Sequence, residues 1–193
     1  MSYEDIQELP LANIVRVEIE TEEETPKKYR LTDVASEAEV TAYISEGNEE
    51  ELRVKNKIKA QNKTEDIVKG YDIRLVSATM IPEILALIDG GSLRYETVGE
   101  EPNTTEELRG YDAPVVGSSV ERKPFTMKIY TEEKDADGST VSYACFIYKH
   151  CKGSPVSYSM QDGQFFAPEL TSKSRPKLGE SPASIDFLNT LPA

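Results

Sequence analysis

The chain has 193 residues, of which 22 are Lys or Arg and 35 are Asp or Glu, giving a net charge of −13. That length suits one domain. Such an excess of acid disfavours binding of the whole chain to nucleic acid or to an anionic membrane, because excess Lys and Arg are needed to hold phosphates. Apolar residues make up 38 % of the sequence, so the core is expected to be lean and part of the chain to lie in arms that order against a partner.

Two further features bear on the compartment. There is no run of 18 apolar residues, so no membrane span or anchor is expected. Residues 1–9 carry Glu4, Asp5 and Glu8, where a secretory signal would have positive charge followed by an apolar stretch. Folding in a reducing cytoplasm is therefore expected, and a disulfide between Cys145 and Cys151 is not.

Alternating apolar residues predict strands in the first half of the chain. Residues 14–19 and 39–44 alternate, and the Ser-Glu-Gly-Asn sequence at 45–48 is typical of a hairpin turn. Residues 52–60 alternate over their whole length and predict one long strand. Residues 67–76 have apolar side chains on both faces, which indicates a more central strand.

One short helix is predicted over 79–90. Thr79 is a candidate N-cap, Pro82 lies in the first turn, and Gly90-Gly91 ends the helix. Ile81, Ile84, Leu85 and Ile88 form its apolar stripe. Residues 99–119 contain Gly, Pro, Asn and Ser with no sustained period, and so predict a long loop.

The remaining strands are predicted as two hairpins. Residues 125–131 and 141–149 are joined through Asp137-Gly138, and residues 156–160 and 165–170 flank Asp162-Gly163. About nine short strands and one helix predict a mainly β fold, an antiparallel β-sandwich with one packed short α-helix and long extended arms. The predicted organisation is an N-terminal arm (1–26) followed by a single β-sandwich domain (27–193), which includes a long hairpin (45–64) and the 99–119 loop.

The sequence shows no ordinary active site. His150, the single histidine, adjoins Cys151, and together with Cys145 it offers three clustered ligands where a closed zinc site needs four. The Asp-Ala-Asp-Gly-Ser run from Asp135 lacks the Glu that a calcium loop needs at its twelfth position, which is Phe146. We therefore expect no enzyme activity, no metal and no cofactor, and two small buried cysteines.

A run of basic residues is the most unusual feature. On a single strand, Arg53, Lys55, Lys57 and Lys59 would share one face. Two interpretations have equal weight. In one, the lysines protect an edge strand or simply face solvent. In the other, the basic residues contact acidic residues of the same or a neighbouring subunit. The candidates for such inter-subunit contacts are Arg53, Lys55, Lys57 and Lys59 with Glu22, Glu23, Glu24, Glu49, Glu50 and Glu51.

The order of these pieces resembles the tail tube (major tail) proteins of tailed bacteriophages. The resemblance covers about residues 27–190 and rests on the order of four stretches: Ile-Pro-Glu-Ile-Leu-Ala-Leu-Ile-Asp-Gly-Gly (81–91), Pro-Phe-Thr-Met-Lys-Ile-Tyr (124–130), Tyr-Ala-Cys-Phe-Ile-Tyr (143–148) and Phe-Phe-Ala-Pro-Glu-Leu-Thr-Ser-Lys-Ser-Arg-Pro (165–176). The N-terminal arm, 1–26, has no counterpart in it.

The resemblance implies a structural subunit whose hexameric rings stack into a hollow tube through which DNA is ejected. It implies a virion location, assembly in the bacterial host cytoplasm, and contacts with tape-measure, tail-terminator and baseplate or tail-tip proteins, with a sheath in a contractile tail. DNA would pass without specific binding, so the basic run is expected at a subunit seam. The alternatives are another tail or neck assembly protein and a ligand-binding β-sandwich module.

Overall fold

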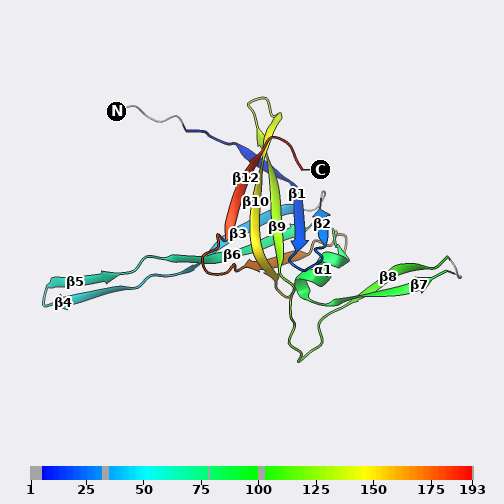
Figure 1. Ribbon diagram of the computed structural model, residues 1–193, viewed down its shortest axis with the longest axis horizontal. Helices are drawn as coiled ribbons and strands as arrows, with labels where there is room; N and C mark the ends of the chain where they lie inside the picture. The colour runs from blue at the N-terminus through cyan, green and yellow to red at the C-terminus, as the bar shows by residue number, and fades with distance from the viewer. Residues whose placement is uncertain (1–5, 32–34, 78, 100–102, 193) are drawn as a thin grey trace.

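The computed structural model describes residues 6–31, 35–77, 79–99 and 103–192. Over these residues the chain forms twelve strands and one helix (Figure 1). Their order is β1 (Leu11–Thr21), β2 (Lys28–Leu31), β3 (Ala35–Ser45), β4 (Glu49–Val54), β5 (Lys57–Lys63), β6 (Ile67–Ser77), α1 (Pro82–Asp89), β7 (Ser92–Val98), β8 (Thr105–Asp112), β9 (Phe125–Lys134), β10 (Thr140–Gly153), β11 (Glu169–Ser174) and β12 (Ala183–Leu188).

One antiparallel sheet folds over on itself to make the body. Its order is β2-β1-β9-β10-β11-β6-β3, with β12 also paired to β10. The first part of β10 lies between β9 and β12, whereas its last residues, Cys151–Gly153, pair with β11. In Figure 1 the strands β12, β10, β9 and β1 stand upright and cross β3 and β6 behind them. The prediction of a mainly β fold with antiparallel sheets and one short helix is confirmed.

The core lies between these two layers and under the helix. Val17 and Met127 come from the upright strands, Ile73 and Leu75 from the crossing strand β6, and Ile88 from α1; each is at most 2 % exposed. Alternation explains the upright layer, since the residues that flank Val17 and Ile19 on β1 point to the outer face. Burial of these side chains stabilises the body by roughly 1.5–3 kcal/mol each.

The helix α1 begins later than the sequence predicts. Ile81, not Thr79, occupies the N-cap position with extended backbone, and it makes no side-chain capping hydrogen bond. Pro82, which needs no amide partner, starts the helix instead. The predicted stop is confirmed: Gly90 is left-handed at φ 85° and its N–H bonds the carbonyl of Ala86. The helix then packs so closely on β10 that a Cβ at Gly153 would lie 2.1 Å from the Ile88 carbonyl oxygen.

Four predicted segments are wrong. The single strand over 52–60 is a hairpin, because the chain reverses at Lys55 (φ 55°), and the turn predicted at 45–48 is the junction between β3 and β4. The loop predicted over 99–119 contains β8, which pairs with β7. The final hairpin predicted over 156–170 is reduced to β11 and an isolated bridge between Ser157 and Glu169. The hairpin between β9 and β10 is confirmed, with Asp137-Gly138 in its turn.

Two strands of the body lie outside the sequence predictions: β2, which pairs with β1, and β12, which pairs with β10. Alternation at 14–19 predicts a strand, but it does not predict that this part of the expected N-terminal arm, as β1, lies inside the sheet between β2 and β9. β1 gains its place through long-range pairing with β9. A lone alternating segment does not reveal such a partner.

Candidate assembly surfaces

Two β-hairpin arms leave the body in opposite directions (Figure 1). We call the hairpin of β4 and β5 the first arm and the hairpin of β7 and β8 the second arm. β4 and β5 form a separate two-stranded sheet, as do β7 and β8. Such a hairpin is marginally stable alone in water, so each arm gains from covering by another surface.

Hydrogen bonds join the two sides of the first arm at its base and attach the second arm to the helix. At the first arm, the Gly47 N–H donates to Asp66 over 2.7 Å, and the Asn48 N–H donates to the Thr64 hydroxyl over 2.7 Å. At the second arm, the Tyr111 hydroxyl donates to Asp89 at the end of α1. Burial and the neighbouring Asp89 carboxylate raise the pKa of Tyr111, so this hydroxyl stays protonated.

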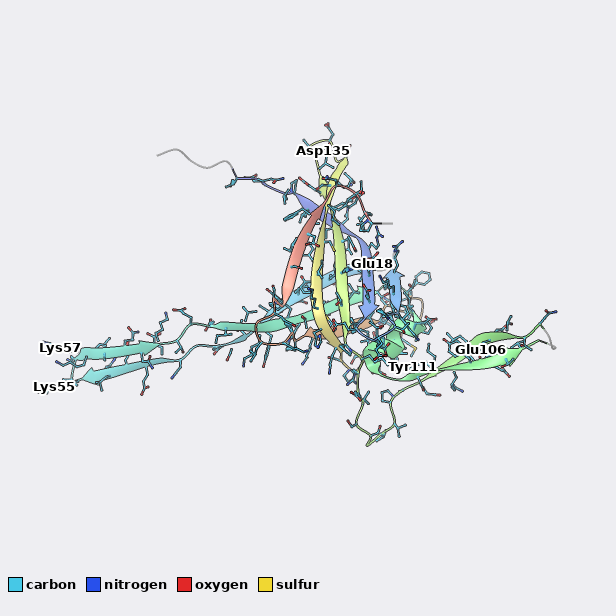
Figure 2. The ribbon with its side chains drawn as sticks, in the orientation of Figure 1. Glu18, Lys55, Lys57, Glu106, Tyr111 and Asp135 are labelled. Carbon is cyan, nitrogen blue, oxygen red and sulfur yellow. The ribbon has the colours of Figure 1, made fainter. Side chains whose placement is uncertain are left out.

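The first arm brings the predicted basic residues together in a different arrangement. Arg53 lies on β4, Lys55 in the turn, and Lys57 and Lys59 on β5, so the expectation of one row on one strand face is wrong. The physical reason is the reversal at Lys55, which places them around the arm tip (Figure 2). Arg53 forms an ion pair of 2.6 Å with Glu51 of the same chain. Within the described residues, the three lysines have no ion pair.

The six glutamates predicted at inter-subunit contacts divide by position. Glu49, Glu50 and Glu51 lie on β4 of the first arm, where Glu49 accepts a hydrogen bond from Gln61. Glu22 and Glu23 make contacts inside the chain, Glu23 with Lys123 at 2.6 Å. Glu24 is exposed. The structure brings neither Glu22 nor Glu23 near the basic tip, and their role between subunits stays a prediction.

Glu22 ties three parts of the body together. One carboxylate oxygen accepts from the His150 N–H (2.9 Å) and from the Thr126 hydroxyl (2.9 Å), and the other lies 2.6 Å from His150 Nδ1. His150 has φ 54° at a bulge in β10. Glu22 therefore fixes a backbone conformation that a non-glycine residue rarely adopts.

The cysteines lie in separate environments. The bulge between Tyr148 and Cys151 changes the facing of β10, so Cys151 enters the core while Cys145 pairs with Tyr130. Burial raises the pKa of the Cys151 thiol to about 12 and also raises the pKa of Cys145. Both thiols therefore stay protonated at neutral pH, unlike nucleophilic cysteines. His150 faces Glu22 rather than either thiol.

The described residues can also be compared with what a metal site, a ligand pocket and a membrane span require. Residues 6–31, 35–77, 79–99 and 103–192 contain no cluster of three or more His, Cys, Asp or Glu side chains placed to hold a metal ion. An open hollow of about 510 Å³ over β1, β2 and β9 is lined largely by charged side chains, several of which pair with one another, such as Lys28 with Glu20 at 3.1 Å. None of the helices among the described residues is long and apolar enough to cross a membrane.

The second arm and β12 are the surface features that sequence reasoning missed. Residues 92–98 alternate Leu93, Tyr95 and Thr97, and the Gly-Glu-Glu-Pro-Asn run after them is a turn signal. These two signals together could have predicted the arm. β12 is too short and too isolated in the sequence to predict a partner strand.

Comparison with known proteins gave a structural likeness and no sequence match. No family model matches the chain, and no curated protein matches it. A solved chain from the cryo-EM structure of the anti-feeding prophage (AFP) baseplate, 6-fold symmetrised, is similar at a TM-score of 0.41 and 9 % sequence identity, covering 96 % of this chain and 97 % of that chain. That likeness concerns the course of the chain and does not define a family.

Proposed function

We propose that the protein is a structural subunit of the tail tube of a bacteriophage or phage-tail-like particle, assembling into hexameric rings that stack into a hollow conduit for DNA. The observation that supports this is the pair of exposed arms leaving a two-layer body on opposite sides (Figure 1). A body with arms in both directions suits head-to-tail contacts, which close into rings when the rotation between subunits closes.

Free sheet edges also suit this role. Within the described residues, β3 pairs with β6 alone, β2 with β1 alone and β12 with β10 alone. An edge strand is a template for another strand, and closure of neighbouring sheets into a barrel removes the edges. Exposed apolar side chains accompany these edges, including Tyr43 on β3 (43 %) and Phe187 on β12 (64 %).

The mechanism is passive transport. DNA that crosses a lumen quickly must not bind its wall, and the net charge of −13 per copy repels phosphates. The basic tip of the first arm then belongs at a seam between subunits, away from the lumen. Tape-measure, terminator and baseplate or tail-tip proteins are the expected partners, with a sheath only in a contractile particle.

Negative-stain electron microscopy of the concentrated, purified protein tests the proposal. Hollow tubes or stacked rings with a channel wide enough for duplex DNA are expected. The double variant Lys55→Glu/Lys57→Glu should block their formation. The matched control Lys152→Glu/Lys173→Glu makes the same charge change at exposed positions of the body and should assemble normally.

Two outcomes would contradict the proposal in different ways. Strictly monomeric wild-type particles at high concentration would favour a ligand-binding module over a tube subunit. Normal tubes from Lys55→Glu/Lys57→Glu would leave the tube proposal standing and remove the seam assignment of the basic tip.

A further inference from the structure

The two arms carry opposite charge. Between Arg53 and Lys59 the first arm has four basic residues and no acidic one. β7 and β8 together carry Arg94 and Arg109 against four acidic residues, which are Glu96, Glu106, Glu107 and Asp112. Because the arms point away from each other, the two charges cannot meet within one chain (Figure 2).

The ion pairs within the second arm involve three of its four carboxylates. Arg94 pairs with Asp112 at 2.8 Å, and Arg109 pairs with Glu96 at 2.7 Å and with Glu107 at 3.3 Å. Among the described residues, Glu106 has no such partner. It is exposed and lies toward the end of the arm (Figure 2).

One face of the first arm combines charge with apolar surface. Val54 pairs with Lys57 across the hairpin and Leu52 pairs with Ala60, so these four side chains share a face. Leu52 is 60 % exposed and Val54 is 49 % exposed. Lys57 thus lies opposite Val54 at the tip, and the next pair on this face toward the base is the exposed apolar pair Leu52 and Ala60.

One face of the second arm has the same layout with the opposite charge. Tyr95 pairs with Leu108 and Thr97 pairs with Glu106, so they share a face. Tyr95 is 52 % exposed and Leu108 is 37 % exposed. An unpaired glutamate toward the tip is followed, one step toward the base, by an uncovered apolar pair.

We propose that the Leu52–Lys57 face of the first arm of one copy docks on the Tyr95–Glu106 face of the second arm of a neighbouring copy. This inference rests on the proposed self-assembly and names the surface that carries it. The partner is a second copy of this chain, because one chain displays both complementary faces in opposite directions. Charge selects the pairing and the apolar side chains gain burial from it. The stretch from Ser45 to Lys55 extends roughly 33 Å at about 3.3 Å per residue, and Figure 1 shows the first arm projecting well clear of the body.

A charge-swap mixture tests the docking. Lys57→Glu and Glu106→Lys are each made in the full chain, and self-association is measured by sedimentation at low ionic strength, alone and as an equimolar mixture. Each variant alone places like charges at the contact and should associate about tenfold more weakly than wild type. In the mixture, opposite charges face each other at every contact, so association should recover. Lys173→Glu, an exposed body residue, is the control and should match wild type.

The outcomes separate this inference from the proposed function. Unchanged association of Lys57→Glu, no recovery in the mixture, or a wild-type chain that stays monomeric at low ionic strength would overturn the docking. Tubes that tolerate both substitutions would support the tube subunit while overturning the docking. Recovery in the mixture, without rings or tubes under the microscope, would support the docking and contradict the tube.

Discussion

Removing the Glu22 side chain should destabilise the body of each subunit. Glu22→Ala deletes the acceptor of two hydrogen bonds of 2.9 Å, from the His150 N–H and the Thr126 hydroxyl, and the 2.6 Å contact with His150 Nδ1. Hydrogen bonds to charged groups contribute about 1.5–3 kcal/mol when lost from a folded protein. The Glu22 side chain is 25 % exposed and that of His150 is 36 % exposed, so water replaces part of the loss. We expect a decrease in the free energy of unfolding of about 2 kcal/mol.

Urea unfolding followed by circular dichroism measures this change. A loss of about 2 kcal/mol corresponds to a fall in Tm of about 4–8 °C for a chain of this size. The matched control is Glu24→Ala, two residues away and exposed, which should stay within about 0.5 kcal/mol of wild type. A double-mutant cycle with Thr126→Ala isolates one of the contacts, and its coupling energy should be about 1 kcal/mol.

Equal stability of Glu22→Ala and Glu24→Ala would show that the Glu22 contacts do not stabilise the body. It would mean that water satisfies the His150 N–H as well as the carboxylate does. Normal monomer stability combined with failed assembly would instead assign Glu22 to the seam between subunits, the role that the charge pattern of the sequence predicts for it.

Three further predictions concern the body. Gly153→Ala should lower the free energy of unfolding by about 2 kcal/mol, since its Cβ would meet the Ile88 carbonyl oxygen at 2.1 Å and displace α1. The control Gly138→Ala, in open space at φ 81°, should lower it by only about 1 kcal/mol. Equal losses of the two variants in urea unfolding would contradict the close packing of α1 on β10. Both cysteines should resist Ellman's reagent until the protein is unfolded. The pKa of Cys151 is about 12 in the fold but near 8.5 in the unfolded chain. The free energy of unfolding should therefore fall as the pH rises above about 8.5, and it should fall less steeply in Cys151→Ala than in wild type. Hydrogen bonds from Thr140, Asn13 and Lys134 lower the pKa of Glu132 to about 2. The contribution of Glu132 to the free energy of unfolding is therefore complete above its unfolded-state pKa, near 4.3, and is lost as the pH falls toward 2. An NMR titration midpoint of Glu132 near pH 4.3 would show that these bonds do not hold the carboxylate.

The assembly surfaces can be predicted in part from the sequence. The concentration of basic residues between Arg53 and Lys59 is a property of composition, so the sequence alone displays it. Their arrangement is not displayed there, because residues 52–60 alternate except at Asn56 and the reversal at Lys55 carries no Gly or Pro signal. The second arm is displayed only in part, through the alternation of residues 92–98. Its turn residues predict a loop, and the short strand Thr105–Asp112 gains its identity only by pairing with β7.

The local features of this protein can be read from its sequence. Alternation sets the inward and outward faces of β1 and β9, the apolar stripe sets the buried face of α1, and Gly90 ends that helix, since each depends on neighbours within a few residues. Three features come from the assembled fold: β1 lies between β2 and β9, Glu22 contacts His150, and the basic and acidic arms point apart. These depend on pairings between residues far apart in the chain, whose free energy comes from the burial and hydrogen bonds that form when the whole sheet assembles.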